Sequence, residues 1–370
     1  MMLKLVSVAI LGLLLTTLLP ASALEVASAA RVMPDLGGGY VSERRPPSRP
    51  AIRFVPAPDR WSLGQLPYEA QRMNNCGPVS TNMVLGHYGI HLSQVYTASK
   101  LRPDPSDVAV DDIEMVTFAK VEYGYGGEVR WGGNMRLIET FVANDIPVIV
   151  LQLLAPDSDI DHFRVVHGYD RVRRTVTLSD SYLGRDLNWS YAYFDNLWKR
   201  RGYEYAVIYP RGKAALVRAI TQRYRTNDRT SERDGIRRAR EYIRSAPGDP
   251  WGWLRLGQLL YHWGHYREAL TVWEHAKTLG LPKKSLWYTE WPMQLLNRMG
   301  RHQEARELAS DAIAKDPSSS EAYYERARAT HALGNTLQAG NDLRRALALA
   351  PYNPHVRGTY AEYAHGHWAQ

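Results

Sequence analysis

Cysteine is almost absent from this sequence, because Cys76 is the only one among 370 residues. An internal disulfide is therefore impossible, and the lone thiol is either buried and inert or free and reactive. Two other kinds of motif are also missing. The chain has no G-x-x-x-x-G-K-[ST] loop for nucleotide phosphates, and its twelve histidines form no His-Glu-x-x-His or other metal-ligand spacing. We therefore expect neither a cofactor nor a metal.

Long apolar runs are scarce as well. The one clear run covers residues 5–19, follows Lys4 and precedes the small residues 21–23. This is the layout of a secretory signal peptide, and the run is short for a membrane span of ~20 residues. We expect residues 1–23 to be a cleaved signal, with an uncleaved anchor as the alternative. The protein would then act outside the cytoplasm, secreted or in the cell envelope, with no stable membrane span.

The formal net charge of +8 raises the question of a nucleic-acid partner. Basic and aromatic residues are not interleaved in any known nucleic-acid-binding motif. An exported protein also rarely meets a genome. We expect no nucleic-acid partner.

The chain divides into three parts after the signal. Residues 24–56 are rich in Gly, Pro, Arg and Ser, which predicts a flexible lead-in. Residues 57–211 mix helical and strand patterns, and from residue 216 to 370 the pattern is helical throughout. Four positions of the helical part recur with a shift of 34 residues: Gly300, Ala305, Ala312 and Pro317 become Gly334, Ala339, Ala346 and Pro351.

These recurring positions are typical of tetratricopeptide repeats, in which small residues lie where helices cross closely. We expect three full units with partial units at both ends. Stacked units bury one continuous core and present a concave face. That face predicts a possible protein partner, although the repeats could equally be a scaffold.

Cys76 lies in the segment "QRMNNCGPVSTNMVLGHYG", residues 71–89. Pro78 and Gly89 are placed as at the first turn and just past the end of a helix, which predicts a helix over about 77–88. Cys76 would then sit at a helix N-terminus, where free N–H groups and the helix dipole favour a thiolate. A buried structural cysteine has no need of this position.

A base for the thiol is expected on a strand. Residues 144–154, 162–170, 175–180 and 204–210 are rich in β-branched and aromatic residues and are predicted to be strands. A hairpin turning near Arg171 would place His162 directly opposite Asp180, which could orient the imidazole. His167 is the rival base. Strand alternation directs His162 and His167 to opposite faces, so only one of them can serve.

Four segments carry a resemblance to a known family: Q-R-M-N-N-C-G-P-V-S-x-x-M-V-L-x-x-Y-G, "IPVIV", "HFRVVHGYD" and "LSD". Together they resemble the papain-like cysteine peptidases of the bacteriocin-leader-processing (double-glycine) type, and most of all their stand-alone C39-like branch. The resemblance implies that Cys76 is the nucleophile, His162 the general base and Asp180 the orienting residue. It also implies that Gln71 joins the backbone N–H of Cys76 in an oxyanion hole. Gln71 stands five residues before the cysteine, where leader peptidases usually have six.

The resemblance implies an α+β papain-like peptidase domain over residues 57–211, followed by an all-α tetratricopeptide-repeat solenoid over residues 216–370. We expect an exported cysteine peptidase that hydrolyses a bond in a peptide or protein substrate. Two alternatives stay open. One is a catalytically silent protein that keeps the fold for binding or scaffolding, and the other is an amide-directed acyl transferase.

Overall fold

The computed structural model of the protein describes residues 54–224, 229–281, 284–287 and 289–368. The signal peptide expected at residues 1–23 and most of the lead-in expected at 24–56 lie outside the described residues. Among the described helices, none is long and apolar enough to cross a membrane.

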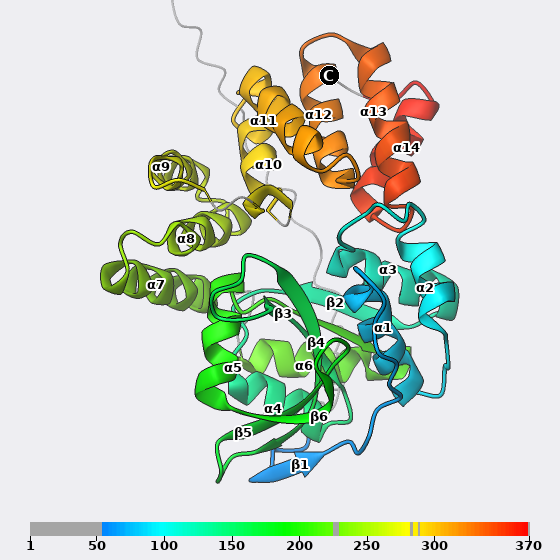
Figure 1. Ribbon diagram of the computed structural model, residues 1–370, viewed down its shortest axis with the longest axis vertical. Helices are drawn as coiled ribbons and strands as arrows, with labels where there is room; N and C mark the ends of the chain where they lie inside the picture. The colour runs from blue at the N-terminus through cyan, green and yellow to red at the C-terminus, as the bar shows by residue number, and fades with distance from the viewer. Residues whose placement is uncertain (1–53, 225–228, 282–283, 288, 369–370) are drawn as a thin grey trace, which may run out of the picture. The chain divides into compact units, whose positions relative to one another are not determined.

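An antiparallel sheet forms the centre of the first part of the described chain (Figure 1). Its strands run in the order β2-β7-β3-β4-β5-β6, and the short β1 pairs with β4. The strand bounds are β1 Arg60–Ser62, β2 Gly126–Arg130, β3 Val148–Leu153, β4 Asp161–Asp170, β5 Thr175–Asp180, β6 Gly184–Ser190 and β7 Tyr205–Tyr209.

The central strands β3, β4 and β7 are buried along almost their whole length because helices cover both faces of the sheet. In β3, Val148 and Val150 belong to one buried core, whereas Ile149 and Leu151 belong to another. Successive side chains of a strand point to opposite faces, so each strand supplies both cores. The first core packs under α4, α5 and α6, and the second under α1, α2 and α3.

Helices α1, α2 and α3 lie between β1 and β2 in the sequence, whereas α4, α5 and α6 each follow a later strand. Their bounds are α1 Cys76–His87, α2 Gln94–Leu101, α3 Asp112–Tyr123, α4 Met135–Ala143, α5 Tyr191–Trp198 and α6 Ala214–Tyr224. Helix α6 adds Val217 and Ile220 to the core beside α4. The packing thus joins α6 to the sheet, whereas the sequence pattern begins the repeats at residue 216.

The hairpin of β4 and β5 differs in register from the sequence prediction. Val165 pairs with Ser179 and Val166 with Leu178, and a bulge follows before Gly168. Extending this register places Arg164, not His162, opposite Asp180, so the predicted pairing about Arg171 was wrong by two residues. The turn is longer than a tight hairpin about Arg171, and it occupies the residues between Asp170 and Thr175. A shift of two residues keeps every side chain on its face, so His162 still shares a face with Asp180.

Helices continue from residue 229 onward and pack as antiparallel pairs (Figure 1). Their bounds are α7 Arg229–Ser245, α8 Pro250–His262, α9 Tyr266–Thr278, α10 Trp291–Arg298, α11 His302–Lys315, α12 Ser320–Ala332, α13 Thr336–Leu349 and α14 Pro354–Ala364. The recurring glycines Gly264, Gly300 and Gly334 have φ of 84°, 73° and 89° and end the first helix of each pair. Such left-handed residues favour glycine, and the recurring alanines are fully buried between helices. The predicted fold class, a sheet-and-helix peptidase-like domain followed by a tetratricopeptide solenoid, is confirmed.

Side chains of the repeats contact the sheet domain around α3. The hydroxyl of Tyr352 donates to Glu122 at 2.6 Å, and its ring packs edge-on against Phe118. Arg345 pairs with Asp104 at 2.9 Å. Tyr352 also belongs to the core beneath α1 and α3. These contacts hold the last repeats beside α3 and the segment that precedes it.

Candidate active site

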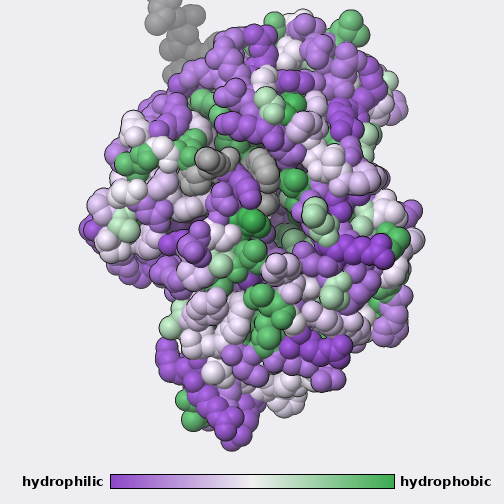
Figure 2. All heavy atoms as spheres, viewed as in Figure 1, coloured by the Kyte–Doolittle hydropathy of each residue, from purple (hydrophilic) through white to green (hydrophobic). Residues whose placement is uncertain are grey.

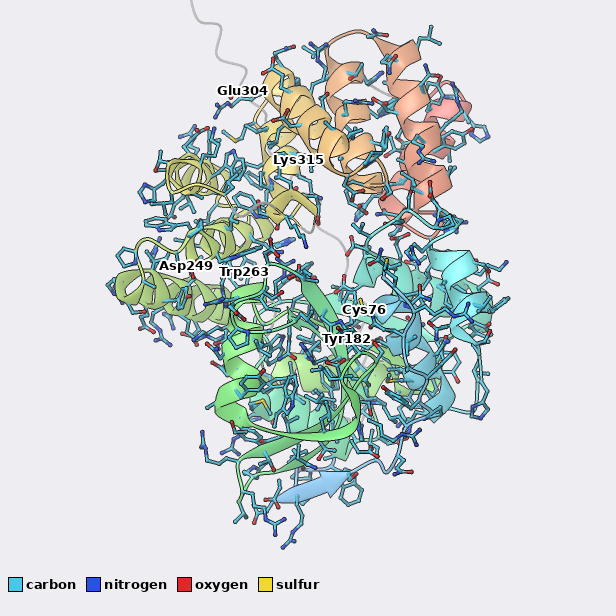
Figure 3. All side chains as sticks on the ribbon, viewed as in Figure 1. Cys76, Tyr182, Asp249, Trp263, Glu304 and Lys315 are labelled. Carbon is cyan, nitrogen blue, oxygen red and sulfur yellow. The ribbon has the colours of Figure 1, made fainter. Side chains whose placement is uncertain are left out.

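Cys76 opens α1, close to the position that the sequence predicts. Pro78 lies in the first turn, where the missing N–H costs no helical hydrogen bond. The thiol is partly buried, whereas the ten residues that follow it are fully buried in the helix. The single cysteine of the chain thus lies at the N-terminus of a buried helix. Figure 3 marks its position beside Tyr182, which follows β5.

His162 connects the thiol to a carboxylate. Its side chain is 4% exposed, and its Nε2 lies 2.8 Å from Oδ1 of Asp180. The imidazole is also close enough to the thiol of Cys76 that each group shifts the pKa of the other. The histidine therefore stands between the two groups, as a nucleophile–base–orienter arrangement requires.

The electrostatic surroundings of Cys76 and His162 favour a negatively charged thiolate beside a positively charged imidazolium. Burial raises the pKa of the Cys76 thiol, but hydrogen bonding and the charge of His162, helped by the N–H groups of Phe163 and Gly77, outweigh it and leave the pKa lowered. Burial lowers the pKa of His162, but Asp180 and Cys76 outweigh it and leave the pKa raised. Both shifts favour the form of the pair in which Cys76 is a thiolate and His162 an imidazolium.

Asp180 is fully buried yet fully hydrogen bonded. Its Oδ1 accepts from the backbone N–H groups of Tyr182 at 2.7 Å and Leu183 at 2.9 Å, besides the imidazole. Its Oδ2 accepts from Nε of Arg164 at 2.7 Å. Burial raises its pKa, but His162, Arg164 and these N–H groups outweigh burial and hold the pKa well below its usual range. A carboxylate with so many donors stays ionised.

Arg164 is the residue of this site that the sequence analysis missed. It is completely buried, and its guanidinium donates to the carbonyl oxygens of Leu153 at 3.1 Å and Leu154 at 2.9 Å as well as to Asp180. Its other face lies 4.8 Å from the ring of Trp189. An arginine two residues after His162 in a strand shares its face, and that spacing was the available signal. Arg164 is a positioning residue, since it acts on the thiol only through Asp180 and His162.

Gln71 is tied to the loop after β5. Its Oε1 accepts from the hydroxyl of Ser181 at 2.7 Å, and its backbone N–H donates to the carbonyl of the same serine at 2.9 Å. Because Ser181 adjoins Asp180, Gln71 lies on the carboxylate side of the site. The bond to Oε1 leaves the amide nitrogen, the atom that an oxyanion hole would use, turned away from Ser181. Its role in an oxyanion hole stays a prediction.

His167 lies apart from the thiol. Its Nε2 is 3.1 Å from the hydroxyl of Ser179 and 3.5 Å from Asp186. Burial lowers its pKa. Since Ser179 and Asp180 point to opposite faces of β5, the two imidazoles occupy opposite faces, as strand alternation predicts. His162, and not His167, is therefore the histidine next to the thiol of Cys76.

The surroundings of the thiol are open on one side. Tyr182 and Leu183 are 66% and 51% exposed, and the ring of Tyr182 lies 6.5 Å from that of His162. Figure 2 shows a mostly hydrophilic surface with hydrophobic residues gathered in a band near the middle of the face. Cys76 also lines a cavity of about 630 Å³. Among the described residues, no group of three or more His, Cys, Asp or Glu side chains is placed to hold a metal ion.

A cysteine at the start of a helix that faces a histidine on a sheet is the arrangement typical of papain-like folds. Residues 64–206 match the model of the Peptidase_C39 like family. The matched segment ends within β7, so the repeats lie outside it. The chain therefore contains a peptidase-like domain joined to a helical repeat domain.

Several solved structures are similar to parts of this chain. A C39-like peptidase described from Bacillus anthracis is 16% identical, with a TM-score of 0.35, over 42% of this chain and 99% of that one. The peptidase domain of Streptococcus ComA, a bi-functional ABC transporter involved in a quorum-sensing pathway, is 21% identical, with a TM-score of 0.32, over 40% and 98%. MamA from Desulfovibrio magneticus RS-1 is 23% identical, with a TM-score of 0.32, over 42% and 91%. No curated protein matches the chain.

Replacing Arg164 by Met should strongly destabilise the sheet domain. The substitution leaves Oδ2 of Asp180 as a buried charge without its partner, which costs about 3–5 kcal/mol in comparable cases. Arg173→Met is the matched control, because that side chain is 79% exposed and lies 3.9 Å from Asp170. The control should change stability by less than about 0.5 kcal/mol. Urea denaturation measures both, and equal effects of the two substitutions would contradict the anchoring role of Arg164.

Removing His162 should raise the pKa of the thiol. In His162→Ala the burial of Cys76 remains, while the group that lowers the pKa is gone, so the pKa should move above the free-thiol value of ~8.5. The rate of alkylation by iodoacetamide, measured against pH, reports this shift at the only cysteine of the chain. His167→Ala should leave the profile unchanged. A shift in His167→Ala, with none in His162→Ala, would show that the base is misassigned.

Proposed function

We propose that this protein is a cysteine peptidase that hydrolyses a peptide bond through Cys76, His162 and Asp180. The observation that carries the proposal is the position of His162, whose Nε2 lies 2.8 Å from Asp180 and whose imidazole lowers the pKa of the Cys76 thiol. The match of residues 64–206 to a peptidase family supports the same reaction. Neither a cofactor nor a metal takes part in the proposed mechanism.

The proposed reaction proceeds through an acyl-enzyme. The thiolate of Cys76 attacks the peptide carbonyl and forms a tetrahedral oxyanion. As this intermediate collapses to a thioester, the imidazolium of His162 gives its proton to the leaving amine. The neutral imidazole then takes a proton from water, which attacks the thioester and releases the acid. Asp180 holds the ring and stabilises its cationic form throughout.

The oxyanion needs donors near Cys76. The backbone N–H of Cys76 belongs to the first turn of α1, where N–H groups have no helical acceptor. We assign the second donor to the side-chain amide of Gln71, which Ser181 holds by its oxygen. A preorganised donor of this kind is worth ~10²–10³ in rate.

Two further features complete the proposal. The apolar segment at residues 5–19 supports export, so the enzyme would work outside the cytoplasm. The tetratricopeptide repeats support the binding of a protein, either as the substrate itself or as a partner that localises the enzyme.

A peptide carrying an acylating electrophile tests the proposed chemistry. The full-length protein should gain the mass of the acyl group at Cys76, and Cys76→Ser and His162→Ala should gain none on the same timescale. Gln71→Ala should acylate ~10²–10³-fold more slowly, and His167→Ala should acylate at the rate of the unmodified protein. Intact-mass spectrometry follows all five proteins. Labelling that persists in His162→Ala, or none in the folded unmodified protein, would refute the proposal.

A further inference from the structure

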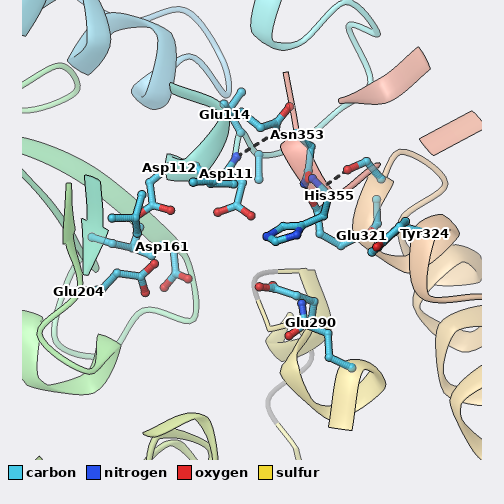
Figure 4. Close-up of a pocket in the computed structure, with 18 of the residues that line it drawn as sticks. Asp111, Asp112, Glu114, Asp161, Glu204, Glu290, Glu321, Tyr324, Asn353 and His355 are labelled. Carbon is cyan, nitrogen blue, oxygen red and sulfur yellow. Dashed lines mark hydrogen bonds between the residues drawn. The ribbon is translucent and has the colours of Figure 1, made fainter. Parts of the chain in front are cut away.

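The cavity that Cys76 lines is strongly acidic (Figure 4). Its walls come from the start of α3, the ends of β4 and β7, and the repeat helices α8, α10, α12 and α14. They carry ten carboxylic side chains against three arginines. In Figure 4 the carboxyl groups of the sheet domain face those of the repeats across a common space, with Asp112, Asp161 and Glu204 on one side and Glu290 and Glu321 on the other.

The arginines of the cavity do not balance this charge. Arg201 pairs with Asp161 at 3.1 Å, and Arg328 pairs with Glu325 at 2.9 Å. The guanidinium of Arg298 lies over the ring of Tyr266, 4.9 Å from its centre. Three arginines cannot balance ten carboxylic side chains, so most of the acidic groups remain in excess.

Four of the acidic side chains have an oxygen with no hydrogen-bond partner among the described residues, and three of them, Asp112, Glu114 and Glu204, are the most buried. Asp112, Glu114 and Glu204 are 3%, 3% and 5% exposed. Among the described residues, Oδ2 of Asp112, Oε1 of Glu114 and Oε2 of Glu204 have no hydrogen-bond partner. A buried polar atom left without a partner costs about 1–3 kcal/mol, and more when it is charged. Side chains of this kind around a cavity are complementary to a ligand that brings donors.

The protonation behaviour of these groups agrees with that complementarity. Burial, together with Glu204 and Asp111, raises the pKa of Asp112 well above its usual range. Burial likewise raises the pKa of Glu114 well above its usual range and that of Glu204 to about 7. A cation bound among them would restore their ionised forms by direct attraction.

We propose that this cavity binds the basic side chains, lysine or arginine, of the peptide whose carbonyl is presented to Cys76. The inference rests on the proposed peptidase function, because it names the substrate class of the same site. A peptide is the favoured ligand since the cavity is continuous with the thiol that would attack it. Its volume of about 630 Å³ lies within the range of ~300–1,000 Å³ that is typical of small-ligand pockets. It therefore admits a short extended segment and not a folded partner.

Binding to full-length Cys76→Ser tests this inference without any turnover. The probes are a short peptide rich in lysine and the same peptide with every lysine acetylated, which removes the charge and keeps the length. Isothermal titration calorimetry should show that the lysine peptide binds more than about tenfold more tightly. Equal affinity for the two peptides would overturn the inference.

A second comparison locates the binding. Asp112→Asn with Glu204→Gln, added to Cys76→Ser, keeps the shape of two facing side chains and removes their charge. This protein should lose at least about tenfold in affinity for the lysine peptide. Glu307→Gln on the same background is the control, because Glu307 is exposed on α11 and does not line the cavity. An equal loss in the control, or no loss in the double variant, would mean that the peptide binds elsewhere.

The two proposals can fail separately. Tight binding of the lysine peptide by Cys76→Ser, with no acylation of the unmodified protein, would refute the peptidase function and leave the binding site for basic side chains. Acylation by neutral peptides, with no preference for lysine in binding, would refute the binding site for basic side chains and leave the peptidase function.

Discussion

The site depends on one buried ion pair, between Arg164 on β4 and Asp180 at the end of β5. Both side chains are removed from water, so each charge is tolerable only because the other charge and several backbone groups surround it. Arg164 is held by the carbonyl oxygens of Leu153 and Leu154 at the end of β3, and Asp180 by N–H groups of the turn before β6. The pair thereby links three strands to the carboxylate, which holds His162 against Cys76. Loss of this pair would disturb the charges of the thiol and the imidazole without a direct contact to either.

Much of this arrangement could be predicted from the sequence, because the features that carry it are local. The helix starting at Cys76 is marked by Pro78 and Gly89, and the strands by their β-branched residues. The repeats are marked by their glycines and alanines. The face of His162 was also predictable, since strand alternation depends on parity alone. The register was not, because the bulge before Gly168 and the longer turn after Asp170 are set by packing against β1 and the helices.

Arg164 and the acidic cavity show where sequence reasoning stops. The spacing in "HFRVVHGYD" places Arg164 on the face of His162, but it does not show that the arginine is buried, because the partner that permits its burial lies on another strand. The carboxylates of the cavity come from α3 and the segment before it, from β4, from the residue before β7, from α12, and from the residues that precede α10 and follow α11. No spacing of residues in the sequence predicts such a cluster. It exists only because Tyr352, Arg345 and Ser318 hold the repeats against the sheet domain.

The central claim is that Cys76 and His162 form a thiolate–imidazolium pair in the resting protein. Because the chain has a single cysteine, the ultraviolet absorbance of the thiolate can be titrated directly as the difference between the unmodified protein and Cys76→Ser. The account predicts a thiolate already present at neutral pH, which disappears only as the solution is acidified well below the free-thiol pKa of ~8.5. A single rise in absorbance centred at or above ~8.5 would contradict it.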